Sequence, residues 1–186
     1  GLITHLTNST YPASDTNRVY ILCTNYLLDV GGSNCADAAG YAMRQGPGKG
    51  TNTPSRGGGG GYGGKGGRGL TDGTGTPAFG GNAYGSMVAP LDPGSGAGAI
   101  PGNIGGSGGG VITIVASGTA TVNGVLSANG GGADPSTWCA GGGSGGSIYL
   151  TCGTFAGAPS GLICANGGTN TWNSGPYLWS GGGGGG

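Results

Sequence analysis

Few side chains in this 186-residue sequence could do acid–base or nucleophilic chemistry. His5 is the single histidine, and there is no glutamate. A Ser-His-Asp triad would have to use His5, and a pair of catalytic carboxylates would have to come from six scattered aspartates. We therefore predict that the protein is not an enzyme. A polysaccharide lyase of the β-helix type is the least favoured alternative, because such a site needs clustered acids and bases.

Glycine-rich loops that bind phosphate are not indicated either. Glycine supplies 53 residues, so G-x-G-x-x-G matches arise from composition alone. A dinucleotide or phosphate loop needs a helix directly after it, and no helical pattern follows any glycine run. Glu, Lys and Gln are nearly absent, so we expect almost no α-helix. We predict no cofactor.

The five cysteines lack the spacing of a metal site. They include no C-x-x-C pair, and one histidine cannot complete a Cys/His zinc site. We predict no metal site. The thiols are either small buried residues in strands or disulfide partners, and the odd number leaves at least one free or paired between chains. Their positions are Cys23, Cys35, Cys139, Cys152 and Cys164.

A repeat organises the elements that must position these residues. Gly105–Gly110 runs into the apolar stretch Val111–Val115, and a second glycine tract at 142–147 runs into Ile148–Cys152. Both copies end on Ala-Asn-Gly-Gly, and the offset is 37 at both ends, so the copies align without a gap. This fixed period predicts a solenoid-like stack in which each repeat buries its apolar face on its neighbours.

Within this repeat, three local features predict contacts. Cys152 and Cys164 lie on the two apolar strands of the second copy, which permits but does not require a disulfide between them. Asn123-Gly124 indicates a hairpin or a tight turn. Asn129 and Asn166 precede Gly-Gly at matching positions, and they could form a side-chain ladder between stacked coils.

We divide the chain as one glycine-rich β domain with five parts. They are N-terminal strands (1–45), a glycine-rich region (46–104), two aligned repeats (105–141 and 142–180) and the start of a further repeat (181–186). In the first part, 2–7 indicates one strand, 18–30 one or two, and 36–43 the only plausible helical turn. The expected fold is all-β: a β-solenoid or parallel β-helix-like stack with polyglycine-II strands.

The glycine-rich region has a period of three. In 56–68 the non-glycine residues are separated by multiples of three, which puts them in one column of a three-residue polyproline-II-like turn. The bare glycine faces would let chains pack closely, so Gly63→Val or Gly66→Val should destabilise strongly and Tyr62→Ser mildly. A flexible linker is the alternative. The column consists of Arg56, Tyr62, Lys65 and Arg68.

Two sets of residues are candidates for surface binding. The column just described could bind acidic glycans, lipopolysaccharide or nucleic acid, although a solvated edge that keeps the bundle soluble is the favoured interpretation. Trp138, Trp172 and Trp179 lie in irregular insertions and could stack on sugars, but we favour burial at a subunit contact. Asn8 begins a glycosylation sequon, which matters only in a secreted protein.

The order Gly-Gly-Ser-Gly-Gly, apolar strand, Ala-Asn-Gly-Gly resembles the glycine-rich extracellular repeats of large secreted bacterial and plant proteins. The likeness covers roughly residues 40–186 and implies parallel β-helix coils and a surface or extracellular structural role, and the family offers no activity to carry over. Residues 57–69 resemble, more weakly, the polyglycine sandwich of T-even-type phage tail-fibre tip adhesins. Snow flea antifreeze proteins share polyglycine-II packing, but their tripeptide spacing holds here for one stretch only.

Composition bears on partners and location. The formal net charge is zero and charged residues make up 6%, so we expect neither a nucleic-acid partner nor membrane insertion. All six basic residues lie before residue 69 with three of the six acids, which makes that part +3 and the remainder −3. Much Gly, Ser, Thr and Asn with little charge favours an extracellular or cell-surface material.

The two ends of the chain predict self-association. In both repeats a glycine run leads into an apolar strand, and the last run, Gly181–Gly186, could be continued by residues 2–7 of another copy. We therefore predict a structural subunit of an extracellular filament or surface assembly that joins head to tail, so that deleting residues 1–7 leaves monomers. The alternatives are an adhesin that binds a receptor or surface glycan, and a segment of a longer protein. The contact would use Leu2, Ile3, Leu6, Gly181 and Gly186.

Overall fold

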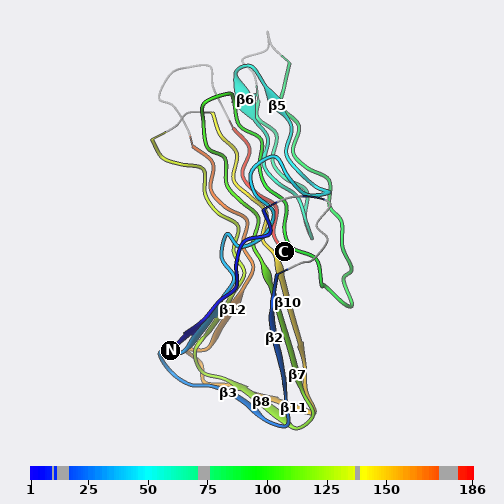
Figure 1. Ribbon diagram of the computed structural model, residues 1–186, viewed down its shortest axis with the longest axis vertical. Coiled ribbons are helices and arrows are strands. Elements are labelled where there is room, and N and C mark those ends of the chain that lie inside the picture. The colour runs from blue at the N-terminus through cyan, green and yellow to red at the C-terminus, as the bar shows by residue number, and fades with distance from the viewer. Residues whose placement is uncertain (10, 12–16, 71–75, 137–138, 172–179) are drawn as a thin grey trace.

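The computed structural model describes residues 1–9, 11, 17–70, 76–136, 139–171 and 180–186. None of these residues is helical, as predicted, and the fold is all-β. The expected helical turn at 36–43 is wrong: Ala38 has a φ of 52°, which an α-helix does not allow. A three-sided stack of short strands forms one half of the molecule, and a bundle of extended glycine-rich segments rises from it (Figure 1).

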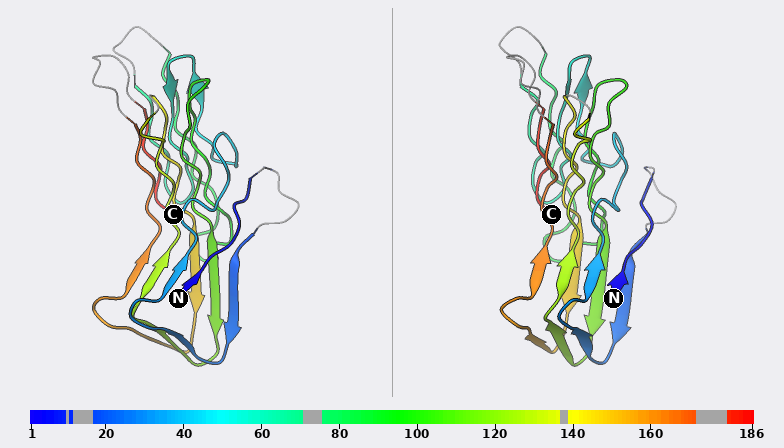
Figure 2. Two further views of the ribbon diagram at one scale, coloured as in Figure 1. Left: turned by 60° about the vertical axis from the view of Figure 1, so that its left-hand side comes forward. Right: turned by 90° about the vertical axis from the view of Figure 1, so that its left-hand side faces the viewer.

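Three layers of three strands build the stack. The chain enters the bundle after each layer (Figures 1 and 2). Layer one is β2 (Val19–Cys23), β3 (Tyr26–Leu28) and β4 (Ser33–Cys35). Layer two is β7 (Val111–Ala116), β8 (Thr119–Val122) and β9 (Val125–Ser127). Layer three is β10 (Ser147–Thr151), β11 (Thr154–Ala156) and β12 (Leu162–Cys164).

Every strand in the stack pairs in parallel with its counterpart in the next layer. The first side has the order β10-β7-β2, and the second side has the order β11-β8-β3. The third side is β1-β4-β9-β12, where β1 (Leu2–Ile3) is an additional short strand on β4. Figure 2 shows the layers lying side by side. The bundle also contains a two-stranded antiparallel pair, β5 (Asn52–Thr53) and β6 (Arg56–Gly57).

The repeats align in space with small shifts that the sequence comparison missed. Ser147 pairs with Val111, a separation of 36, whereas Leu162 pairs with Val125, a separation of 37. The shift has a physical reason, since a strand slipped by one residue turns every side chain to the other face. With a separation of 36, Ile148 pairs with Ile112, and both side chains pack in the core. The longer corner between β11 and β12 restores the period.

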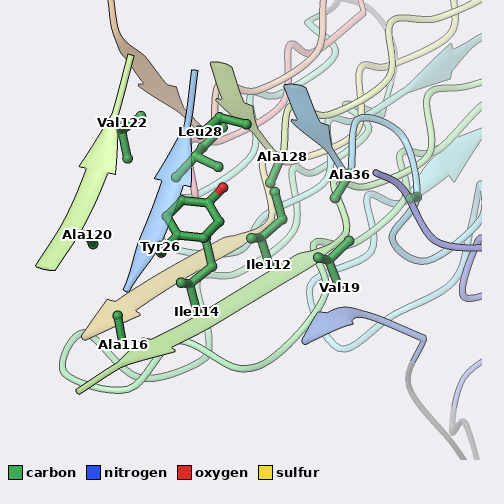
Figure 3. Packing of buried hydrophobic residues seen from close by; sticks show 12 residues of the cluster. Val19, Tyr26, Leu28, Ala36, Ile112, Ile114, Ala116, Ala120, Val122 and Ala128 are labelled. Atoms are coloured by element: carbon green, nitrogen blue, oxygen red, sulfur yellow. The ribbon is translucent and has the colours of Figure 1, made fainter. Parts of the chain in front are cut away.

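Side chains from all three sides fill the interior of the stack (Figure 3). Layer two is covered on both sides, and its Ile112, Ile114 and Leu126 are fully buried. Tyr26 also points inward, and its hydroxyl accepts a hydrogen bond from Asn34 Nδ2 at 2.8 Å. Burial raises the pKa of Tyr26 to about 12. The Asn123-Gly124 turn is a tight corner between two sides and not a hairpin, because β8 and β9 belong to different sheets.

The glycine bundle is held by backbone hydrogen bonds in several directions. The successive amides of Gly59, Gly60 and Gly61 donate to the carbonyls of Gly67, Gly142 and Gly48, which lie on three different neighbouring segments. The segments approach so closely that a Cβ on Gly81 would lie 1.7 Å from the carbonyl oxygen of Gly48. Glycine is therefore required here by the packing between segments.

Candidate functional site

The two ends of the three-layer stack present strands with unpaired edges. At one end, among the residues that the structure describes, β10, β11 and β12 each pair along one edge only, and we call this end the third-layer face. At the other end lie β2, β3 and β4, the first-layer face, where β2 and β3 have one free edge and β4 is covered by β1. A free edge presents unpaired N–H and C=O groups to any other extended chain.

The two faces have matching strands. The three strands of layer one have 5, 3 and 3 residues, and so have the three strands of layer three. Both sets pair in parallel with the same layer-two strands. The faces therefore have the geometry of successive layers of one stack.

Strand β1 lies where the third side of a preceding layer would lie. Leu2 pairs with Ser33, and Ile3 pairs with Asn34. Within its own chain, β1 joins the third side, and only two of the residues 2–7 expected as a strand are in one. The side chains of Leu2, Ile3 and Leu6 are 66%, 49% and 80% exposed, so they add little burial to the chain that carries them.

His5 attaches this N-terminal segment to layer two. Its Nε2 accepts a hydrogen bond from the N–H of Val111 at 3.1 Å, and its Nδ1 lies 2.8 Å from the carbonyl of Leu6. Nε2 therefore carries no proton, and Nδ1 donates to Leu6. Burial lowers the pKa of His5, while the Leu6 carbonyl opposes the shift. The imidazole takes the place of a missing backbone acceptor and has no acid or base partner among the residues described.

Asn8 anchors the far end of the same segment. It is 2% exposed; its Nδ2 donates to the carbonyl of Ala39 at 3.2 Å, and its Oδ1 accepts from the N–H of Asn17 at 2.7 Å. A glycan on Nδ2 would have to displace these bonds, and glycosylation of Asn8 stays a prediction.

A groove of about 720 Å³ opens beside the third-layer face, between β10, β12 and the bundle. Tyr62, Met87, Ile148, Ile163 and Gly186 are among its lining residues. Gly186 makes the same backbone hydrogen bond here as the glycines that precede the first-side strands β7 and β10. The N–H of Gly186 donates to Ala165 at 2.8 Å, as that of Gly146, just before β10, donates to Ala128. Gly186 therefore lies where a further first-side strand would begin.

A ladder of polar residues crosses the three layers on the third side. The N–H of Asn166 donates to Oδ1 of Asn129 at 2.8 Å, and the N–H of Asn129 donates to Oδ1 of Asp37 at 2.7 Å. The two asparagines do meet across the layers as predicted, but the bonds run from a backbone N–H to a side-chain oxygen and not between side chains. Asp37 was missed because only the two asparagines belong to the aligned repeats. Gly181, a predicted contact residue, lies inside the bundle, where an added Cβ would be 1.9 Å from the carbonyl oxygen of Gly67.

The predicted surface column is not a surface feature as a whole. Arg56 and Tyr62 are 6% and 2% exposed, while Lys65 and Arg68 are exposed. Arg68 lies 5.0 Å from the ring centroid of Phe79. The period of three defines the faces of the segment but not which face neighbouring segments cover. Trp138, Trp172 and Trp179 lie outside the described residues.

All five cysteines are free. A Cys152–Cys164 disulfide is absent, because Cys152 follows β10 on the first side while Cys164 ends β12 on the third. The described residues include no cluster of three or more His, Cys or Asp side chains that could hold a metal ion. In the same ranges no helix is long and apolar enough to cross a membrane.

Comparison with known proteins adds no relative. No family model matches the chain, and neither a curated protein nor a solved structure does.

Proposed function

We propose that the protein is a structural subunit that stacks head to tail into a filament or surface assembly outside the cell. The third-layer face of one copy would receive the first-layer face of the next. The observation that carries this proposal is that both faces present strands of 5, 3 and 3 residues with the same parallel partners. Such a contact is heterologous and does not close, so it produces a fibre.

The finer architecture follows from the same reasoning. The three-sided half is a short β-solenoid, supported by parallel pairing of every layer with the next. The bundle consists of polyglycine-II segments, supported by successive glycine amides that donate to three different neighbours, as a turn of three residues requires. Both are repeating structures, and a further copy would extend each of them with the same pattern of backbone hydrogen bonds.

Open hydrogen-bonding groups at the third-layer face support stacking. In layers one and two, the N–H of Ala36 donates to the carbonyl of Ser127 at 2.7 Å, and the N–H of Ala128 donates to the carbonyl of Cys164 at 2.9 Å. The matching N–H of Ala165 has no acceptor among the described residues, and Oδ1 of Asn166 has no donor there. A docked copy would supply Cys35 as the acceptor and Asp37 as the donor. These hydrogen bonds would fix which end of one copy meets the next copy, and which residues pair across the contact.

The proposed contact differs in one respect from the sequence-based assembly. Leu2, Ile3 and Leu6 were expected to complete the last coil of a neighbour, but β1 is paired with β4 of its own chain. If β1 of one copy paired with β12 of another, a strand position would stay empty on each of the other two sides. We therefore propose direct docking of layer one on layer three, with β1 displaced.

Sedimentation velocity over a concentration series, under reducing conditions, tests the proposal. We expect the weight-average mass to rise with concentration. Asn166→Ala should weaken association without changing the stability of the monomer, since its Oδ1 is used only between copies. Asn129→Ala is the matched control: it removes an acceptor inside the chain and should cost about 1 kcal/mol of folding stability. A single monomeric species at all concentrations would refute the proposal.

A further inference from the structure

The cysteines of the first side occupy matched places at the two ends of the stack. Cys23 ends β2 in layer one and pairs with Ala116 of layer two. In layer three, Thr151 pairs with Val115, and continuing this register by one residue places Cys152 beside Ala116, just before the register changes at Thr154 and Thr119. Cys23 and Cys152 both pack against the interior cluster. Cys23, Ala116 and Cys152 therefore form a row across the three layers, with cysteine in both outer layers and alanine in the middle layer.

The third side repeats this arrangement. Cys35 and Cys164 end β4 and β12, and both pair with Ser127 of β9. Again the outer layers have cysteine and the middle layer does not. The neighbouring residues Asn34 and Ile163 pair with the buried Leu126, so the row of cysteines points away from the interior.

Within one chain neither row can form a disulfide. Two strand spacings separate the cysteines of a row, about 9.6 Å, which exceeds the limit of about 7 Å between bridged Cα atoms. All four thiols are free, in agreement with this separation. When layer three of one copy meets layer one of the next, the same cysteines lie one spacing apart. That distance, about 4.8 Å, is within the range of disulfides.

We propose that the two rows are interchain disulfide sites, which join Cys152 of one copy to Cys23 of the next, and Cys164 of one copy to Cys35 of the next. The proposal rests on the proposed head-to-tail stacking. A small-molecule disulfide such as oxidised glutathione is the oxidant. One cysteine thiolate attacks it and releases one glutathione thiolate, and the facing cysteine then attacks the mixed disulfide and releases the second. Two protein thiols become one disulfide, and their two protons pass to the released glutathione thiolates.

Strand β1 controls access to the third-side row. Ile3 pairs with Asn34, so Thr4 lies beside Cys35, where Cys164 of a second copy would come. Two paired residues with exposed side chains hold β1 on β4, and a short edge strand of this kind protects an edge without closing it permanently. Deletion of residues 1–7 removes this competitor.

The test is to incubate the full chain with oxidised glutathione and to map disulfides by mass spectrometry of non-reduced peptides. We expect a ladder of covalent oligomers with Cys23–Cys152 and Cys35–Cys164 peptides, and a several-fold higher yield after deletion of residues 1–7. Cys152→Ala and Cys164→Ser copy the residues of layer two. Each should remove one peptide, and together they should abolish the ladder. Cys139→Ala should leave it unchanged, because Cys139 is 1% exposed in the bundle.

The outcomes separate this inference from the function on which it rests. Association under reducing conditions, with no disulfides or with other pairs such as Cys164–Cys164 after oxidation, overturns the inference alone. Absence of association in both conditions overturns the proposed stacking and the disulfides together. Loss of both association and cross-links on deletion of residues 1–7 would mean that β1 pairs with a neighbour, and would also overturn the inference. Circular dichroism of each variant confirms that it is folded.

Discussion

The hydroxyl oxygens of Tyr62 and Ser147 lie 2.6 Å apart, and this bond joins the glycine bundle to the first residue of β10. Ser147 donates in turn to the carbonyl of Asp92 at 2.5 Å, so the tyrosine hydroxyl is the donor to Ser147. The Tyr62 ring also meets the Tyr84 ring edge-on, with centroids 4.9 Å apart. Burial raises the pKa of Tyr62. This buried contact connects the two halves of the molecule.

Substitution of Tyr62 should therefore be costly, in contrast to the mild effect expected from the sequence. Tyr62→Phe removes one buried hydrogen bond and should cost about 1 kcal/mol. Tyr62→Ser also leaves a cavity and should cost about 3–5 kcal/mol. Tyr20→Phe, at an exposed ring, is the control and should lie within about 0.5 kcal/mol of the parent. Denaturant unfolding measures all three, and an equal cost for all of them would contradict this role.

The glycines of the bundle should differ in tolerance according to their neighbours. A Cβ on Gly66 would lie 2.1 Å from the carbonyl oxygen of Gly59, whereas a Cβ on Gly185 has no atom within 4 Å. Gly66→Ala should therefore destabilise by about 3 kcal/mol, because neighbouring backbone must move. Gly185→Ala should be neutral or stabilising by less than about 1 kcal/mol. Gly63→Ala, whose nearest atom is at 2.9 Å, should lie between them.

These three alanine variants are compared by thermal unfolding. Equal stability of all three would indicate that the segments are not packed against one another. It would favour the flexible linker that the composition also allowed.

His5 makes the attachment of the N-terminal segment dependent on pH. Its neutral form accepts the Val111 N–H, and burial lowers its pKa, so the folded state binds fewer protons than the unfolded state. The stabilisation is complete above about pH 6.5, the ordinary pKa of histidine, and is lost as the pH falls through the lower folded value. His5 is the only histidine, so few other groups titrate in this window.

NMR titration of the imidazole in the folded and the urea-unfolded chain measures this difference. We expect the lower pKa in the folded chain. His5→Gln, whose amide oxygen can accept the same bond, should flatten the dependence of stability on pH between 5.5 and 7.5. A higher pKa in the folded chain would mean that the imidazole is held as a cation, contrary to the geometry.

Composition and period predicted the parts of the fold that depend on repetition. The absence of helix among the described residues, the parallel pairing of the two repeats and the matched places of Asn129 and Asn166 all follow from local residue types and a fixed spacing. The burial of Tyr62 did not, because a three-residue period places side chains on a face without saying which neighbour covers it. The side on which β1 lies was also missed, since two apolar residues fit any of the three sides.

The strand register and the match between the two end faces could not be predicted from the sequence for a different reason. Corners of unequal length shift the separation from 36 to 37 residues between β10 and β12, and this changes which side chains face inward. The pairing of Cys23 with Ala116, and hence the match with Cys152, depends on that register. The two aligned repeats correspond to layers two and three, so their alignment says nothing about the residues of layer one.

Head-to-tail docking of layer one on layer three is tested most directly by the axial rise per subunit in filaments, measured by electron cryomicroscopy. Three layers at about 4.8 Å per strand predict a rise of about 14 Å, with continuous parallel sheets across each junction. A rise of about 19 Å would mean that β1 remains between copies as a fourth layer. That result, or a protein that stays monomeric at every concentration, would contradict the account.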